Sequence, residues 1–169
     1  FEDTDVIVLT GTNPVISHSS PYQASPLVNQ TRKFRQHQAR GGKLIVVDPR
    51  KTETARQATV HLQPMPGTDA EIFAGLIYLI LKNRWHDKNF CNRWLTQLQA
   101  LENAVSAFTP EFVSQRAGVD VDQLHQAAQL IGAAKKPAIG FGTGTSMSPN
   151  ANTAAHMIEQ FEAQLAERG

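Results

Sequence analysis

Short apolar runs alternate along the chain with longer segments of helical periodicity. The runs at 6–10 and 43–47 are mostly apolar and β-branched and are bounded by charged residues or glycine, which is typical of strands that a parallel sheet buries on both faces. The second run ends at Asp48-Pro49, because proline cannot donate to a sheet ladder. Two shorter strands are expected at 60–63 and 137–140.

Helices are expected between and after these strands, because apolar positions recur there at helical spacing. Their ends carry the usual signals: Asp69 opens one helix, Thr109-Pro110-Glu111 opens another, and Gly41-Gly42 closes a third. The expected segments are 27–40, 69–83, one or two helices within 87–107, a helix starting at about 110, 121–134 and 152–166. The stretches 12–26 and 140–146 are expected to be loops.

The alternation of strand and helix predicts an α/β fold with a doubly wound, mostly parallel sheet and helices on both faces, of Rossmann-like type. A chain of 169 residues fits one domain, so residues 1–169 are expected to form a single unit. In such sheets ligands bind at the carboxyl ends of the strands, near the point where the strand order reverses. The loops after the four strands are therefore the first places to look for function.

The composition excludes several classes of protein. Hydrophobic residues make up 41% and charged residues 18% of the chain, as in globular rather than disordered proteins. Sixteen basic and fifteen acidic residues leave a net charge of +1, so no general attraction to nucleic acid or to anionic lipid is expected. The apolar run 72–81 is far shorter than the roughly 20 residues that cross a bilayer. The single cysteine, Cys91, is expected to pack within a helix, and no CxxC pair is present to hold a metal.

The loop after the first strand combines backbone freedom with polar groups. Gly11 permits close approach of the backbone to a ligand, and Asn13 tolerates left-handed dihedral angles while carrying both a donor and an acceptor. Ser17 and His18 follow within reach of the same ligand. Taken alone, this loop is better explained as an ordinary strand-ending turn, so its interpretation depends on the other loops.

The second strand ends in Asp48-Pro49-Arg50. An acid at this position binds ribose hydroxyls in dinucleotide folds, and Arg50 is suited to neutralise a phosphate or to form an ion pair. Capping of a helix by Asp48 is the structural alternative. No GxGxxG follows the first strand, and the acid comes about fifteen residues later than in the NAD fingerprint, where it follows the glycines by about 20. An NAD site is therefore disfavoured.

The third and fourth strands are followed by two more glycine-containing segments. Pro66-Gly67-Thr68-Asp69 opens a helix whose amides and dipole suit anionic oxygens, and the Asp69 carboxylate matches two donors of a guanine Watson–Crick edge. Helix capping by Asp69 is compatible with that role. Gly140 and Gly142 begin a glycine- and hydroxyl-rich loop suited to approach a phosphate or a base.

In order and separation, the four loops resemble those of the molybdopterin oxidoreductases, the family of formate dehydrogenases, periplasmic nitrate reductases and DMSO reductase. The matching strings cover nearly the whole chain, and the pairing of DPR with PGTD is the most specific of them. The strings are GTNPVISH, KLIVVDPRKTETARQATVHL, PMPGTDAEIFAGLIYLIL, FTPEFVSQRAGVDVDQLHQAAQLI and the segment around GFGTG.

The resemblance implies that the domain holds the guanosine and pyrophosphate end of one of two molybdopterin guanine dinucleotides (bis-MGD), which carry molybdenum or tungsten in the complete protein. In such enzymes the metal and its dithiolene ligands carry the redox chemistry, while protein loops position the cofactor. No catalytic residue and no metal ligand is expected within this chain. The residues expected to bind the cofactor are Gly11, Asn13, Ser17, His18, Asp48, Pro49, Arg50, Gly67, Asp69, Gly140 and Gly142.

The resemblance also implies a piece of a larger oxidoreductase that is inactive alone, with the metal ligand, an iron–sulfur cluster and the second cofactor-binding half outside it. The expected partners are the remaining domains of the same enzyme and iron–sulfur electron-transfer subunits, with neither nucleic acid nor membrane bound. A cytoplasmic location is expected, and the periplasm is the alternative. Two other functions stay open: a metal-free relative with a structural role in an electron-transfer complex, and a free-standing NAD or nucleotide-binding module.

Overall fold

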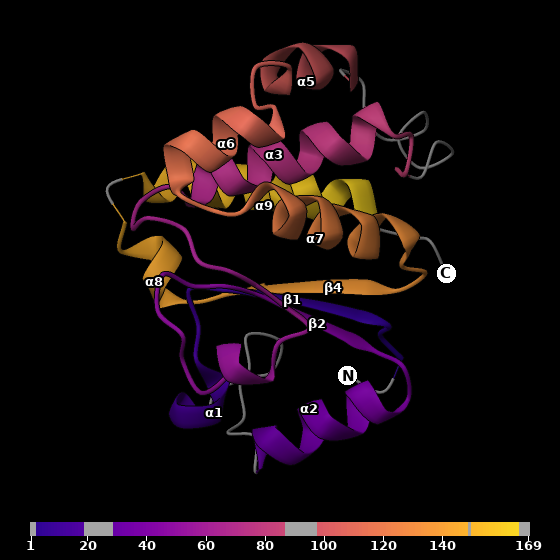
Figure 1. Ribbon diagram of the computed structural model, residues 1–169, viewed down its shortest axis with the longest axis vertical. Helices are drawn as coiled ribbons and strands as arrows, with labels where there is room; N and C mark the ends of the chain where they lie inside the picture. The colour runs from indigo at the N-terminus through magenta and orange to yellow at the C-terminus, as the bar shows by residue number, and fades with distance from the viewer. Residues whose placement is uncertain (1–2, 19–28, 87–97, 149, 166–169) are drawn as a thin grey trace.

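Four parallel strands form one sheet in the order β3-β2-β1-β4 (Figure 1). The computed structural model describes residues 3–18, 29–86, 98–148 and 150–165. At the centre of the sheet Val8 pairs with Ile45 on one side and with Ile139 on the other. The strands are β1 (Val6–Thr10), β2 (Lys43–Val47), β3 (Val60–Leu62) and β4 (Pro137–Phe141).

The strand order places the reversal of the chain between β1 and β4. The chain steps outward from β1 to β2 and β3, and then crosses back to add β4 on the free edge of β1. The loops that follow β1 and β4 therefore leave the sheet side by side and diverge to opposite faces, which opens a crevice at the carboxyl ends of the strands.

One face of the sheet is covered by α2 (Gln30–Ala39). On the same side, α1 (Pro14–Ser17) and the short 3₁₀ helix η1 (Ala55–Gln57) lie toward the carboxyl ends of the strands (Figure 1). Side chains alternate between the faces of a strand, so every second residue of β1 and β2 points to this layer. The buried apolar residues on this side are Ile7, Leu9, Phe34, Leu44, Val46 and Ala55.

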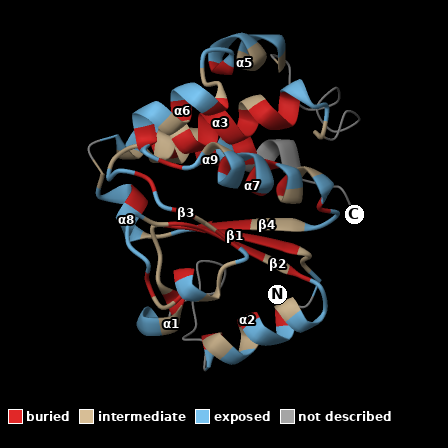
Figure 2. Cartoon of the chain, viewed as in Figure 1, coloured by how far each residue is buried: buried red, intermediate tan, exposed pale blue. Residues whose placement is uncertain are grey.

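Among the described residues, the other face is covered by α3 (Asp69–Lys82), α7 (Val121–Ala133) and α9 (Ala151–Leu165), and α5 (Leu98–Val105) and α6 (Pro110–Ala117) lie on the side away from the sheet (Figure 1). The helix α3 is apolar on nearly all sides because neighbouring helices surround it. Within this layer Phe73 and Phe161 pack edge to face with ring centroids 5.6 Å apart. Figure 2 shows buried residues concentrated in the strands and in this helix. The helix α8 (Thr143–Ser146) lies at the strand ends.

The expected fold class is confirmed: the sheet is parallel and helices cover both faces. The four strands lie within one residue of their expected positions. Two expected loops were wrong in part, since 12–26 contains α1 and 140–146 contains α8. These helices have four residues each, too few to show an amphipathic repeat.

The helix expected at 27–40 begins later, at Gln30. Its N-cap is Asn29, which takes a left-handed conformation with φ 60° and accepts a hydrogen bond from the Arg32 amide. The expectations for Cys91 and for a helix within 87–97 lie outside the described residues. Within the described part of the chain, no helix is long and apolar enough to span a membrane, and no three His, Cys, Asp or Glu residues are grouped to hold a metal ion.

Candidate functional site

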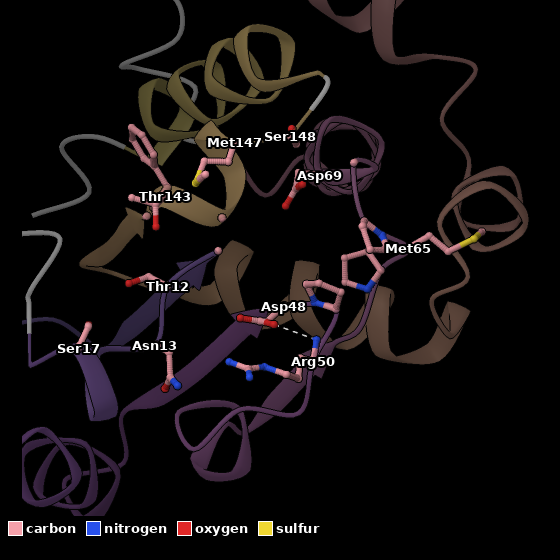
Figure 3. A pocket seen from close by; sticks show the side chains of 18 residues that line it. Thr12, Asn13, Ser17, Asp48, Arg50, Met65, Asp69, Thr143, Met147 and Ser148 are labelled. Carbon is pink, nitrogen blue, oxygen red and sulfur yellow. Dashed lines mark hydrogen bonds between the residues drawn. The ribbon is translucent and has the colours of Figure 1, made fainter.

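A pocket of about 760 Å³ lies at the carboxyl ends of the strands, and the segments after all four strands contribute to it (Figure 3). Small-molecule sites commonly measure about 300–1,000 Å³, so the volume fits a ligand of nucleotide size. We call this cavity the strand-end pocket. Its lining residues are Gly11, Thr12, Asn13, Ser17, Asp48, Pro49, Arg50, Pro64, Met65, Pro66, Gly67, Asp69, Phe141, Gly142, Thr143, Gly144, Met147 and Ser148.

The fold brings nine of the eleven residues expected to bind a cofactor into this one pocket. The two exceptions are His18 and Gly140. His18 is exposed at the end of α1, and Gly140 is buried inside β4 opposite Leu9. The expectation that polar residues from distant parts of the sequence lie together is met, while their contacts with a ligand stay predictions.

Glycines hold the loops after β1 and β4 in direct contact. Gly11 has φ +57°, and a Cβ atom on it would lie 2.4 Å from the Thr145 amide nitrogen. A Cβ on Gly144 would lie 2.8 Å from the Gly11 Cα, and one on Gly142 would lie 2.7 Å from the Thr12 Cβ. Gly11 and Gly142 were expected to let the backbone approach a ligand, which stays a prediction. In the structure these two glycines and Gly144 let one loop approach the other.

Asn13 connects the first loop to the segment before η1. Its amide nitrogen donates to a Glu53 carboxylate oxygen at 2.9 Å, and its amide oxygen accepts from the Thr54 hydroxyl at 2.7 Å and from the Thr54 amide at 3.3 Å. The donation from Asn13 lowers the pKa of Glu53 below its usual value. Asn13 therefore fixes the first loop, which lines the pocket, to the segment before η1, and the sequence alone did not indicate its partners.

Asp48 and Arg50 form a compact turn at the end of β2. The Arg50 amide donates to Asp48 Oδ1 at 2.8 Å, so Asp48 closes an Asx-type turn, and the alternative that it caps a helix was wrong. His61 Nε2 lies 2.9 Å from the Asp48 carbonyl oxygen and must carry the proton, because a carbonyl only accepts. The Arg50 guanidinium is exposed and makes no ion pair with a described residue, which leaves it available to an anion.

Asp69 projects into the opposite side of the pocket from the first turn of α3 (Figure 3). Its Oδ1 atom lies 3.4 Å from the Thr10 hydroxyl oxygen. Burial raises the pKa of Asp69. The carboxylates of Asp48 and Glu71 act in the same direction, whereas hydrogen bonds from Thr10 and from the Asp69 backbone act against them. Hydrogen bonds donated by a ligand would therefore stabilise the ionised form of Asp69, which burial disfavours.

Several residues that line the pocket were not predicted from the sequence, because no local pattern distinguishes them. Three of the five large apolar side chains that are exposed among the described residues, Met65, Phe141 and Met147, line this pocket, and Met147 is 83% exposed. Isolated exposed apolar residues are ordinary, but three of them lie around this one cavity, as they do at surfaces that bind a ligand or a partner. The Ser148 hydroxyl oxygen is buried and has no hydrogen-bond partner within the described part of the chain.

Comparisons with known proteins agree with the resemblance seen in the motifs. A family model described as molybdopterin oxidoreductase matches residues 1–168. Formate dehydrogenase H of Escherichia coli is 32% identical over 146 residues, which make up 86% of this chain and 19% of that protein. The nitrate reductase of Synechocystis sp. is 35% identical over 136 residues, or 80% of this chain and 18% of that protein.

A solved structure is similar over almost the whole chain. The acetylene hydratase from Pelobacter acetylenicus matches with a TM-score of 0.82 and 25% sequence identity, covering 96% of this chain and 21% of that one. The chain thus spans about one fifth of the length of the relatives it matches. The part that the acetylene hydratase shares with it is nearly the whole α/β unit described above.

Proposed function

Because this chain belongs to the molybdopterin oxidoreductase family, we propose that its strand-end pocket binds the guanosine and pyrophosphate end of a molybdopterin guanine dinucleotide. One observation carries the proposal. Two separate segments, the turn after β2 and the start of α3, place Asp48, Arg50 and Asp69 in one cavity, and these side chains match the ribose, phosphate and guanine parts of such a ligand.

The guanine base is assigned to Asp69. An ionised carboxylate only accepts hydrogen bonds, and its two oxygens together offer about four acceptor sites. The Watson–Crick edge of guanine presents two neighbouring donors, N1–H and the exocyclic amine, whereas adenine presents an acceptor at N1. Asp69 uses one acceptor site for Thr10, so enough sites are left to accept both guanine donors.

The ribose and the phosphates are assigned to the turn after β2. Asp48 uses Oδ1 for the Arg50 amide, and its Oδ2 atom is suited to accept from a ribose hydroxyl, as acids at this strand end do in dinucleotide folds. The Arg50 guanidinium is a planar fork of donors that matches phosphate oxygens. Its position beside Asp48 sets the order along the pocket: base at Asp69, sugar at Asp48 and phosphate at Arg50.

The pocket also fits the cofactor in its apolar surfaces. Met147 and Phe141 expose thioether and ring surfaces to the pocket, and such side chains pack well on planar aromatic systems. When bound, the cofactor supplies the metal and its dithiolene ligands for the reaction. The residues of this chain bind its far end, orient it and keep its sugar and phosphates out of solvent.

The range of relatives supports a positioning role. Proteins named formate dehydrogenase, nitrate reductase and acetylene hydratase all share this unit, so the unit supplies what they have in common. We infer that the complete protein is a molybdenum or tungsten oxidoreductase that carries bis-MGD and an iron–sulfur cluster. Its other domains and electron-transfer subunits are the proposed partners of this unit, and the cytoplasm is its proposed location.

Nucleotide binding to the chain tests the proposal directly. Calorimetric titration is expected to show GDP binding more tightly than ADP or NAD. Asp69→Asn is expected to weaken GDP binding by about 10- to 100-fold, because it places an amide donor against guanine donors. Asp122→Asn is the matched control, since Asp122 also lies in the first turn of a helix but is exposed on α7, outside the pocket.

Three results would reject the proposal. Equal affinity for GDP and ADP would show that the pocket does not recognise guanine. A preference for NAD that Asp69→Asn leaves unchanged would favour the free-standing NAD module instead. A folded chain that binds none of these nucleotides would point to the metal-free structural relative.

A further inference from the structure

Two buried threonine hydroxyls contact each other behind the lining of the strand-end pocket, and one of them also contacts Asp69. Thr10 is the last residue of β1 and is 0% exposed, and Thr145 of α8 is 1% exposed. The Thr10 hydroxyl oxygen lies 3.4 Å from Asp69 Oδ1 and 3.3 Å from the Thr145 hydroxyl oxygen. Valine has the same shape and carries no polar atom, so hydroxyls at these depths are costly unless they are paired.

The chemistry of the three groups sets the direction of the hydrogen bonds. The ionised Asp69 carboxylate has no proton to give, so the Thr10 hydroxyl donates to it. A hydroxyl has one proton, and Thr10 has then used its own. The Thr145 hydroxyl must therefore donate to the Thr10 oxygen, and the donation runs from Thr145 through Thr10 to Asp69.

We propose that Thr145 and Thr10 are positioning residues that anchor one Asp69 oxygen to the end of the sheet, so that the carboxylate faces a guanine edge in a fixed orientation. This inference rests on the proposed function and deepens it by adding the groups that set base recognition. The chain of hydroxyls joins β1, α8 and α3, and the glycine contacts at Gly11 and Gly144 also hold the segments after β1 and β4 together.

Side chains near Asp69 explain why it needs such an anchor. The negative charges of Asp48 and Glu71 act on it, and Glu71 is paired with Arg116 of α6 at 3.4 Å. Arg50 lies across the pocket, and the segments 11–17 and 137–148 contribute no charged side chain. No cation therefore contacts the Asp69 carboxylate among the described residues, and the threonine hydroxyl is the side-chain donor that favours its ionised form.

Thr10→Val tests the proposal, because it removes the hydroxyl while keeping the shape, and Thr10→Ser is the matched control that keeps the hydroxyl. Two measurements are made on each: the carboxyl-carbon NMR titration of Asp69, and calorimetric titration with GMP at several pH values. We expect Thr10→Val to raise the pKa of Asp69 further and to weaken GMP binding about three- to tenfold, with binding lost at a higher pH on acidification. Both oxygen–oxygen distances exceed the common value of about 2.7–2.8 Å, so a larger effect is not expected.

Thr145→Val is expected to change both measurements in the same direction by a smaller amount, because it acts through Thr10. It also serves as the test if Thr10→Val does not fold. A folded Thr10→Val chain whose Asp69 titration and GMP affinity equal those of Thr10→Ser would overturn the proposal. If GMP does not bind the parent chain but the Asp69 titration still shifts in Thr10→Val, the guanine ligand is refuted while the chain of hydroxyls is supported.

Discussion

Replacing Gly11 by alanine tests the central feature of the site, the close contact between the loops after β1 and β4. Two separate penalties are expected. Gly11 has φ +57°, a left-handed conformation that costs an L-residue roughly 1–2 kcal/mol. In addition, the new methyl carbon would lie 2.4 Å from the Thr145 amide nitrogen and 2.7 Å from its hydroxyl oxygen, so the loops must separate.

The size of each penalty can be estimated from two control variants. Gly41→Ala carries only the penalty of the left-handed backbone, because Gly41 has φ +90° with nothing within 4 Å of the added atom. Gly144→Ala meets only the second, because its new atom would lie 2.8 Å from the Gly11 Cα and oxygen, and such overpacking costs about 1–3 kcal/mol. Gly11→Ala should therefore lower the free energy of unfolding by about 2–5 kcal/mol, a large part of the roughly 5–15 kcal/mol that domains possess.

Urea unfolding followed by circular dichroism measures these differences, and the melting temperature gives a second estimate. For a chain of this size each kcal/mol lowers the melting temperature by roughly 2–4 °C. The loss in Gly11→Ala is expected to approach the sum of the losses in the two controls. If Gly11→Ala loses no more stability than Gly41→Ala, the contact between the two loops is wrong, and so is the shape of the pocket floor.

Three further predictions concern single side chains. Arg50→Gln is expected to weaken GDP binding about three- to tenfold while leaving guanosine binding unchanged. Arg32→Gln on the surface of α2 is the control. Equal losses of GDP and guanosine affinity in Arg50→Gln would contradict a phosphate contact. Asn13→Ala is expected to raise the pKa of Glu53, whose pKa the Asn13 donation lowers, and an unshifted NMR titration of Glu53 would count against that bond. Burial lowers the pKa of His37, although the hydrogen bond to the Lys43 carbonyl acts in the opposite direction. The unfolded chain therefore protonates His37 more readily than the folded chain does, and the free energy of unfolding falls as the pH drops below about 6.5. His37→Phe should reduce that fall, and an unchanged pH profile of unfolding would refute the role of His37.

The sheet could be predicted from the sequence because its signals are local. The residues of β1 and β2 are mostly apolar and β-branched, which is what burial on both faces requires. Thr109 and Asp120 cap their helices as their residue types suggest. The parallel order and the crevice at the strand ends then follow from general rules of connection. This is why most of the candidate pocket residues could be named before their positions were known.

The parts of the site that escaped prediction depend on contacts between distant segments. Asn13 is bonded to Glu53 across 40 positions, and Thr10 contacts Thr145 across 135 positions. No spacing rule relates such residues, because the distance between them is set by the packing of the whole domain. The four-residue helix α8 belongs to the same group, since it forms where the glycines after β4 pack on the first loop.

The use of the glycines also distinguishes this site from a NAD-type site. In the GxGxxG fingerprint, glycines bring backbone amides close to a pyrophosphate. Here the Gly142 amide donates to the Thr10 carbonyl and the Gly144 amide to the Gly11 carbonyl, each at 3.0 Å, so these amides are already used within the protein. The proposed ligand contacts are therefore those of the side chains of Asp48, Arg50 and Asp69 rather than those of the Gly142 and Gly144 amides. Recognition by side chains makes affinity sensitive to isosteric changes such as Asp69→Asn, whereas binding by a glycine-rich backbone loop would hardly respond to them.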